Sequence, residues 1–213
     1  MLETLSEFAF DDQIFRLANP RNLGQFLRDF DARDAAEIGE FMGFAEVADL
    51  TDLLDSPFTR KSFLAPPRNF GTPTRFSDGS YPVFYGALEE ATAKAEVTHH
   101  YAREARGDLS TARTLYYTLF HCRFAGNVVD LQQQTHVWPD LVSDLTDNPF
   151  CQSLGAEGKA RGLDGFLAPS ARAPLGTTVP VFSRPSLADP APDGVVEFSF
   201  DAAANDPVVT HIT

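Results

Sequence analysis

Alternation of apolar and polar residues predicts a chain rich in short strands. A first strand is expected at Ile14–Leu17, just before the turn signal Asn19-Pro20. Residues 113–124 alternate over a long run, and together with 127–131 they predict a hairpin about Ala125-Gly126. Further strands are expected at Pro82–Tyr85, Gly165–Leu167, Pro180–Ser183, Val195–Phe200 and, as an edge strand, Val208–Ile212.

Apolar residues at helical spacing separate these strands. Residues 22–55 carry two such runs and predict a helical insert of structural character. Further helices are expected at Ala87–Arg106 and Asn148–Arg161. The buried stripe of the Ala87–Arg106 helix is expected to comprise Leu88, Ala91, Ala95 and Ala102. The length of 213 residues fits one domain, residues 1–213.

Charge and cysteine content exclude several functional classes. The net charge of −13 argues against direct binding of nucleic acid and suits a basic protein partner. Cys122 and Cys151 are too few for a disulfide framework or a Cys-rich zinc site, so each is expected to be buried. The acidic first residues lack the features of a signal peptide, and no stretch approaches the ~20 apolar residues of a membrane span. These features predict a cytoplasmic protein without a membrane segment.

The stretch Gly71–Tyr101 carries the candidate chemistry. It offers Arg75 on a loop rich in Gly, Pro and Ser, Tyr85 at the end of a strand, and Glu96 on a helix. The simpler alternative for Glu96 is a surface glutamate that pairs with Arg103. The residue types alone are compatible with both interpretations of Glu96, a catalytic carboxylate and a charge on the helix surface.

Other chemistries lack the residues that they need. Glu96-x-x-His99 has the helical spacing of a di-iron site, but the pair occurs once, so no metal site is expected. Ser170 is not in a Gly-x-Ser-x-Gly elbow, and no Walker or Gly-x-Gly-x-x-Gly loop is present. A carboxylate with arginines and aromatic rings suits cleavage of an N-glycosidic bond, in which a carboxylate stabilises an oxocarbenium-like cation.

A set of short segments occurs in a fixed order along the chain: Phe15-Arg16-Leu17, Thr74-Arg75-Phe76-Ser77, Val83–Ala87, Ala95-Glu96-Val97 with His99-His100, Cys151–Leu154, Gly162–Gly165, Pro169–Arg172 and Pro180–Phe182. In their residues and order these segments resemble the RES-domain family, the toxins of RES–Xre type II toxin–antitoxin systems. The resemblance covers about residues 14–184, and the helical insert at 22–55 departs from it.

The resemblance implies an α+β fold similar to that of ADP-ribosyltransferases, with a mixed β core and peripheral helices. It implies an enzyme that uses NAD as a substrate, without another cofactor, and cleaves the nicotinamide–ribose bond by hydrolysis or phosphorolysis. It also implies an Xre-like helix-turn-helix antitoxin as partner. By position, the implied catalytic residues are Glu96, which would act on the ribosyl cation or the nucleophile, Arg75 and Tyr85. The implied substrate-binding residues are Arg16, Ser170, Gln152 and Arg172.

Two alternatives stay open at this point. One is an ADP-ribosyltransferase that modifies a specific protein, and the other is a catalytically silent module that only binds an antitoxin. The sequence also leaves open the acceptor of ADP-ribose and the oligomeric state, with a homodimer among the possibilities.

Overall fold

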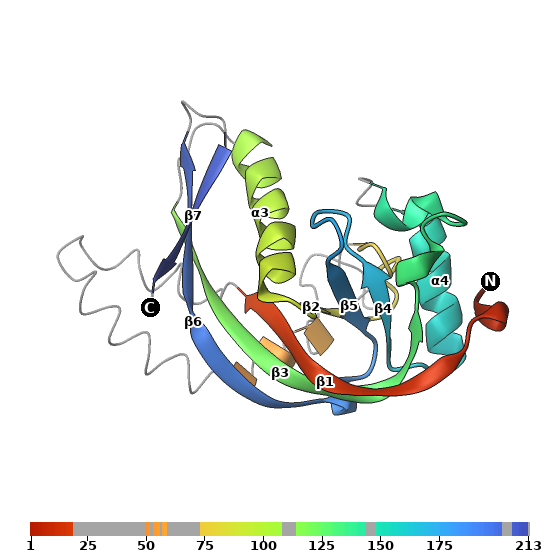
Figure 1. The fold of residues 1–213 in the computed structure, drawn as a ribbon. Helices are drawn as coiled ribbons and strands as arrows, with labels where there is room; N and C mark the ends of the chain where they lie inside the picture. Colours follow the sequence, from red (N-terminus) through yellow and green to blue (C-terminus); the bar gives the residue numbers. More distant parts are fainter. Residues whose placement is uncertain are drawn as a thin grey trace.

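Long strands organise the fold, because β1 and β3 pair with each other from Glu7↔Val129 to Ala18↔Thr118. The computed structural model describes residues 1–18, 50–51, 53–55, 57–58, 73–107, 114–143, 148–201 and 206–212. Figure 1 shows the strands and helices in these residues. The strands are β1 (Glu7–Ala18), β2 (Phe84–Ala87), β3 (Leu115–Asp130), β4 (Gly165–Pro169), β5 (Thr177–Val181), β6 (Leu187–Asp201) and β7 (Asp206–Ile212). The helices are α3 (Glu90–Gly107) and α4 (Pro149–Ala160), with 3₁₀ turns at Leu2–Thr4, Gln132–Gln134, Pro139–Val142 and Arg184–Ser186.

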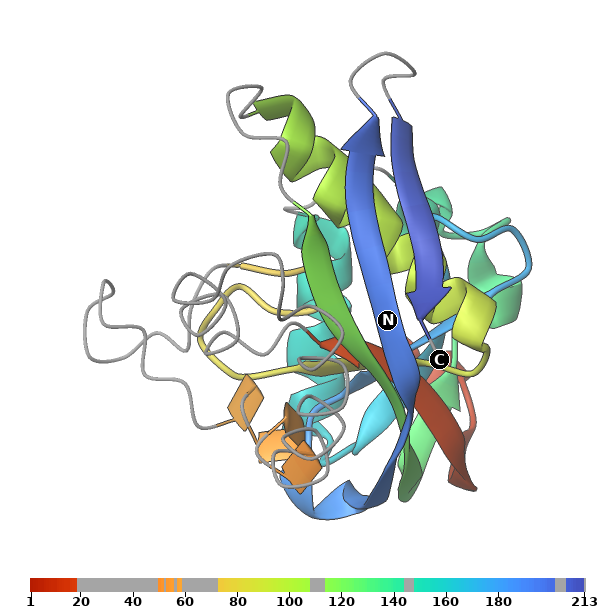
Figure 2. The same ribbon diagram turned by 90° about the vertical axis from the view of Figure 1, so that its left-hand side faces the viewer.

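The strands form one mixed sheet in the order β1-β2-β5-β4-β3-β6-β7. The additional β1–β3 pairing joins β1, β2, β5, β4 and β3 into a closed circuit, from which the β6–β7 hairpin extends. The β3–β4 pair is parallel, whereas the other pairs are antiparallel. Figure 2 shows β6 and β7 beside β3, with α3 behind them. The fold class is therefore α+β, as expected.

The predicted hairpin about Ala125-Gly126 is wrong, because β3 runs straight through these two residues. A Cβ atom on Gly126 would lie 2.5 Å from Cβ of Asp164. The glycine therefore marks a close approach of another segment rather than a turn. One long strand can then pair with β1 along one edge and with β6 and β4 along the other.

Other strand predictions hold in position but not in extent. β1 begins at Glu7 rather than Ile14, because its acidic first half pairs with β3 while its side chains remain largely exposed. β6 likewise begins earlier than predicted, whereas β2 and β5 are shifted by a few residues. β7 has the position predicted for an edge strand and pairs only with β6 among the described strands.

The helices agree with the sequence in position, but the buried stripe predicted for α3 is only partly right. Ala102 is buried as predicted and Ala91 is exposed, whereas Thr92, Ala93 and Tyr101 are buried without having been predicted to be. α4 begins after Asn148, whose side chain accepts a hydrogen bond from the backbone N–H of Cys151. The predicted insert at 22–55 lies almost entirely outside the described residues, although residues 50–51 and 53–55 are helical.

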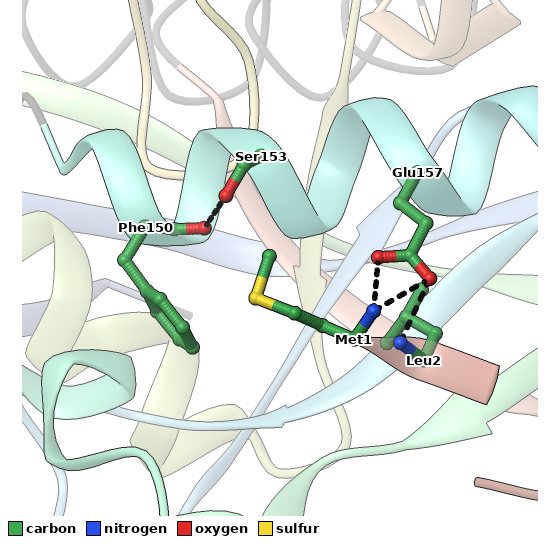
Figure 3. Close-up of polar contacts among 5 residues, drawn as sticks. All are labelled: Met1, Leu2, Phe150, Ser153 and Glu157. Carbon is green, nitrogen blue, oxygen red and sulfur yellow. Dashed lines mark hydrogen bonds and ion pairs between the residues drawn. The ribbon is translucent and has the colours of Figure 1, made fainter. Parts of the chain in front are cut away.

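Large aromatic and aliphatic side chains fill the core, and both cysteines are buried as predicted. At one end of the sheet the first residues pack on α4 (Figure 3). The Glu157 carboxylate accepts hydrogen bonds from the α-amino group of Met1 and from the Leu2 backbone N–H, while the Leu2 side chain is fully buried. Within the described part of the chain, no helix has the length and apolarity that crossing a membrane requires.

Candidate active site

A cleft of about 390 Å³ opens between α3, the ends of β1 and β2, and the loop that precedes β2. Five of the seven residues expected to form a site line it: Arg16, Arg75, Tyr85, Glu96 and Arg172. They come from positions far apart in the chain, and the closed circuit of strands brings them together. The remaining two, Ser170 and Gln152, lie behind the cleft walls and bond to groups there.

Glu96 is half-buried on α3 and is held by Ser170. The Ser170 hydroxyl donates a hydrogen bond of 2.7 Å to Oε1 of Glu96. Oγ of Ser170 in turn accepts hydrogen bonds from the backbone N–H groups of Arg172, at 3.0 Å, and Ala173, at 2.9 Å. These two backbone donors direct the hydroxyl proton towards the carboxylate. Ser170 therefore fixes the orientation of Glu96. The side chain of Arg103, the alternative partner of Glu96, lies outside what the structure describes.

Four residues of α3 face the cleft at helical spacing: Ala93, Glu96, Val97 and His100. Ala93 is buried, Glu96 and Val97 are half-buried, and His100 is exposed. The side chains that line the cleft therefore become more exposed along the helix towards its C-terminal end. His100 was not predicted from the sequence as a site residue, although its position four residues after Glu96 was the signal that could have found it.

The loop at residues 73–77 forms the opposite wall, and Arg75 is bonded within it. Its guanidinium donates hydrogen bonds to the carbonyl oxygens of Leu141, at 2.6 Å, and Ser143, at 3.0 Å. Thr74 and Ser77 form a short bridge on either side of Arg75. A guanidinium has five N–H donors, so Arg75 can hold this loop in place and still present N–H groups to the cleft.

Tyr85 also supports the loop. Its hydroxyl donates to Oγ1 of Thr74, at 2.8 Å, and accepts from the backbone N–H of Phe76, at 2.9 Å. Burial raises the pKa of Tyr85 to about 12, which keeps the phenol neutral at physiological pH. With the hydroxyl engaged in this way, the ring is the part of Tyr85 that the cleft can use.

Gln152 acts on the same loop from α4. Its Nε2 donates a hydrogen bond of 3.1 Å to the carbonyl oxygen of Thr74. Tyr81 adds a bond of 2.6 Å from its hydroxyl to the carbonyl oxygen of Phe76. Both contacts position the loop from outside the cleft.

Arg16 enters the cleft from the C-terminal end of β1. Its Nη1 donates a hydrogen bond of 2.7 Å to the carbonyl oxygen of Tyr85. The guanidinium carbon lies 4.4 Å from the centroid of the Phe84 ring, which is the geometry of a cation–π contact. A charge in a mostly apolar strand is thus accommodated by a carbonyl and an aromatic face.

The resulting cleft combines an apolar surface with charge of both signs. Phe15, Leu17, Ala87 and Val97 supply the apolar lining, Arg16, Arg75 and Arg172 supply cations, and Glu96 supplies a carboxylate. This arrangement suits an anionic ligand that also carries a flat ring. Among the described residues, no group of three or more His, Cys, Asp or Glu side chains is placed to hold a metal ion.

Comparison with known families identifies the chain. The model of the RES domain matches residues 45–201, which is more than half of the chain. The chain belongs to the RES domain family. The match includes Arg75, Tyr85, Glu96 and Ser170, whereas Arg16 lies before its first residue.

Solved structures similar to this RES domain include a chain of the crystal structure of the M. tuberculosis MbcT–MbcA toxin–antitoxin complex. The similarity covers 87% of this chain and 86% of that chain, at 17% sequence identity and a TM-score of 0.47. None of the curated proteins matches the chain.

Proposed function

We propose that this RES-domain protein is the NAD-consuming toxin of a toxin–antitoxin system and cleaves the bond between nicotinamide and ribose. One observation carries the proposal: a carboxylate, held by Ser170, faces a cleft that three arginines also line. Family membership supports it, because the resemblance of the sequence to RES toxins implies NAD as the substrate.

The chemistry assigned to Glu96 is electrostatic. When the N-glycosidic bond breaks, its electron pair leaves with nicotinamide, whose ring nitrogen becomes neutral, and positive charge develops on the ribose. A fixed carboxylate stabilises this oxocarbenium-like state because it need not reorient as the charge forms. The nucleophile, water or phosphate, then adds to the ribose carbon, and a proton is released when water attacks.

The other lining residues serve binding. The arginines fit the phosphates or the nicotinamide ribose, since guanidinium groups donate hydrogen bonds to oxygen and bind phosphate oxygens with two parallel hydrogen bonds. The ring of Tyr85 offers an apolar face to the nicotinamide, while its hydroxyl keeps the loop in place. In this assignment Ser170 and Gln152 are positioning residues, because their polar groups bond to Glu96 and Thr74.

The proposal extends to the fold and the partner. The mixed sheet with peripheral helices is consistent with a fold similar to that of ADP-ribosyltransferases. The net charge of −13 suits a basic partner, and an Xre-like helix-turn-helix antitoxin would then carry the contact with DNA.

Release of nicotinamide from NAD by the purified protein tests the activity. The wild type should release it with water or with added phosphate, and Glu96→Gln should lower the rate at least ~100-fold, as removal of an electrostatic stabiliser does. Glu90→Gln is the matched control, because Glu90 is on the same helix and pairs with Lys94. It should keep the wild-type rate.

The product that carries the ADP-ribose group distinguishes hydrolysis, phosphorolysis and protein ADP-ribosylation. Free ADP-ribose indicates hydrolysis, and its phosphate ester indicates phosphorolysis. A single labelled protein band after incubation of labelled NAD with a cell lysate indicates ADP-ribosylation of a protein. Binding of an antitoxin without any consumption of NAD would leave a silent binding module and would refute the proposal.

A further inference from the structure

His100 is the exposed member of the α3 stripe that faces the cleft. It follows Glu96 by four residues, so the two side chains lie on the same face of the helix, with Cβ atoms about 5–6 Å apart in such pairs. Because Ala93 is buried and Glu96 is half-buried, His100 marks the open end of the cleft on this wall.

The charged groups around the cleft differ in how they respond to pH. Arg16, Arg75 and Arg172 carry guanidinium groups, which are cationic throughout the physiological pH range, and burial raises the pKa of Tyr85 to about 12. Among the described residues that line the cleft, His100 alone belongs to a type that titrates near neutral pH, at about 6.5. A change in the charge of His100 would therefore change the potential in the cleft within this pH range.

The preceding histidine provides an internal comparison. The ring of His99 lies edge-on to that of His100, with centroids 5.8 Å apart. His99 is not among the residues that line the cleft. Of these two histidines with neighbouring rings, His100 lines the cleft and His99 does not.

We propose that the protonated imidazole of His100 binds the pyrophosphate of the dinucleotide at the open end of the cleft. The inference rests on the proposed function and deepens it, because it orients the substrate. With the nicotinamide–ribose bond at Glu96, the pyrophosphate lies one ribose further along the molecule, and one helical turn outward leads to His100. The nicotinamide then occupies the deeper part of the cleft, beside Tyr85 and Ala93.

Calorimetric binding of ADP-ribose at pH 6 and pH 8 tests this role without turnover. The charge of the pyrophosphate is the same at both pH values, so a change in affinity reports on the protein. For an exposed charged pair we expect the wild type to bind about three- to fivefold more weakly at pH 8. His100→Gln should bind equally at both values, whereas His99→Gln should keep the wild-type dependence.

Two further measurements separate binding from chemistry. Nicotinamide riboside, which lacks phosphate, should show no effect of His100→Gln at either pH. In NAD turnover at pH 6, His100→Gln should raise KM and leave kcat unchanged. A loss of kcat with unchanged KM, or an unchanged pH dependence of ADP-ribose binding in a folded His100→Gln protein, would overturn the assignment.

Failure of this inference and failure of the proposed function give different results. If the wild type binds neither NAD nor ADP-ribose at either pH, the proposed function is wrong, and with it the role of His100. If both ligands bind and nicotinamide is released, but His100→Gln changes nothing, only the role of His100 is wrong. Thermal unfolding of each variant shows whether it is folded.

Discussion

The two walls of the cleft are built in opposite ways. On the loop wall, residues 73–77, polar groups bond to distant parts of the chain: Arg75 to two carbonyls near residue 142, and the Thr74 carbonyl to Gln152 on α4. On the α3 wall, the one hydrogen bond to the Glu96 carboxylate from the described residues comes from Ser170.

The loop wall gives the cleft its shape, whereas the α3 wall carries the carboxylate to which the chemistry is assigned. The loop wall is an irregular segment, so hydrogen bonds from α4, β2 and Tyr81 replace the regular pattern that a helix or strand would supply. The α3 wall is already rigid as a helix and needs only one contact to orient its carboxylate. We therefore expect changes behind the loop to affect folding most and changes behind Glu96 to affect catalysis most.

Gly155→Ala, behind the loop wall, should have the largest effect. A Cβ atom at this position of α4 would lie 2.0 Å from the carbonyl oxygen of Phe76, so the loop or the helix must move. Alanine normally favours a helix by about 1 kcal/mol over glycine, and here we expect the opposite sign, a loss of about 3 kcal/mol in the free energy of unfolding. Urea denaturation measures this loss, and NAD turnover should fall with it.

An exposed position on the same helix provides the control for the loop wall. Ser153→Ala changes a side chain that bonds only to the carbonyl of Phe150 within α4, among the described residues. Its stability should stay within about 0.5 kcal/mol of the wild type, with full activity. Wild-type stability in Gly155→Ala would show that the loop is not held against α4.

Ser170→Ala tests the α3 wall. The Glu96 carboxylate should lose its fixed orientation, and kcat for NAD should fall about 10- to 100-fold, which corresponds to about 1.4–2.7 kcal/mol. The free energy of unfolding should fall by about 1 kcal/mol, because backbone N–H groups of Arg172 and Ala173 lose their acceptor.

A double variant distinguishes positioning from a general structural role. If Ser170 acts through Glu96, adding Ser170→Ala to Glu96→Gln should lower the residual turnover no further. A multiplicative loss in the double variant would show that Ser170 acts independently of Glu96.

The sequence predicted where helices and strands form better than it predicted which segments pack against one another. α4 follows from the helical spacing of apolar residues, and β7 from its alternation. The hairpin at Ala125-Gly126 failed because small residues mark both turns and close packing, and the Asp164 side chain that requires Gly126 is 38 residues away in the chain. Local patterns do not contain such long-range contacts.

The same limit applies to the candidate site. Residue types and the family resemblance selected side chains that the fold brings to one cleft, but they did not say which face it and which stand behind it. Gln152 reaches a carbonyl 78 residues away, and Ser170 a carboxylate 74 residues away. These partners depend on the strand order β2-β5-β4, which no local pattern specifies.

Substitution of Leu175 should have the smallest effect on stability. Leu175 lies in the loop that also carries Ser170 and Arg172, on the α3 side of the cleft. It is fully exposed and has a φ of 67°, in the left-handed region that costs a branched residue about 1–2 kcal/mol. Hydrogen bonds from Ser170 N–H to Gly176 and from Gly176 N–H to Ala173 hold the loop in this conformation. Asparagine tolerates left-handed backbone better, so Leu175→Asn should raise the free energy of unfolding by about 0.5–1 kcal/mol.

Leu175→Ala separates backbone conformation from the removal of an exposed apolar side chain. Alanine keeps a Cβ atom and therefore most of the left-handed cost, so its stability should stay close to that of the wild type. Equal stabilisation by alanine and asparagine in urea denaturation would mean that φ is not the cause. Because the loop keeps its hydrogen bonds in both variants, Ser170 should still orient Glu96, and the rate of nicotinamide release should be unchanged.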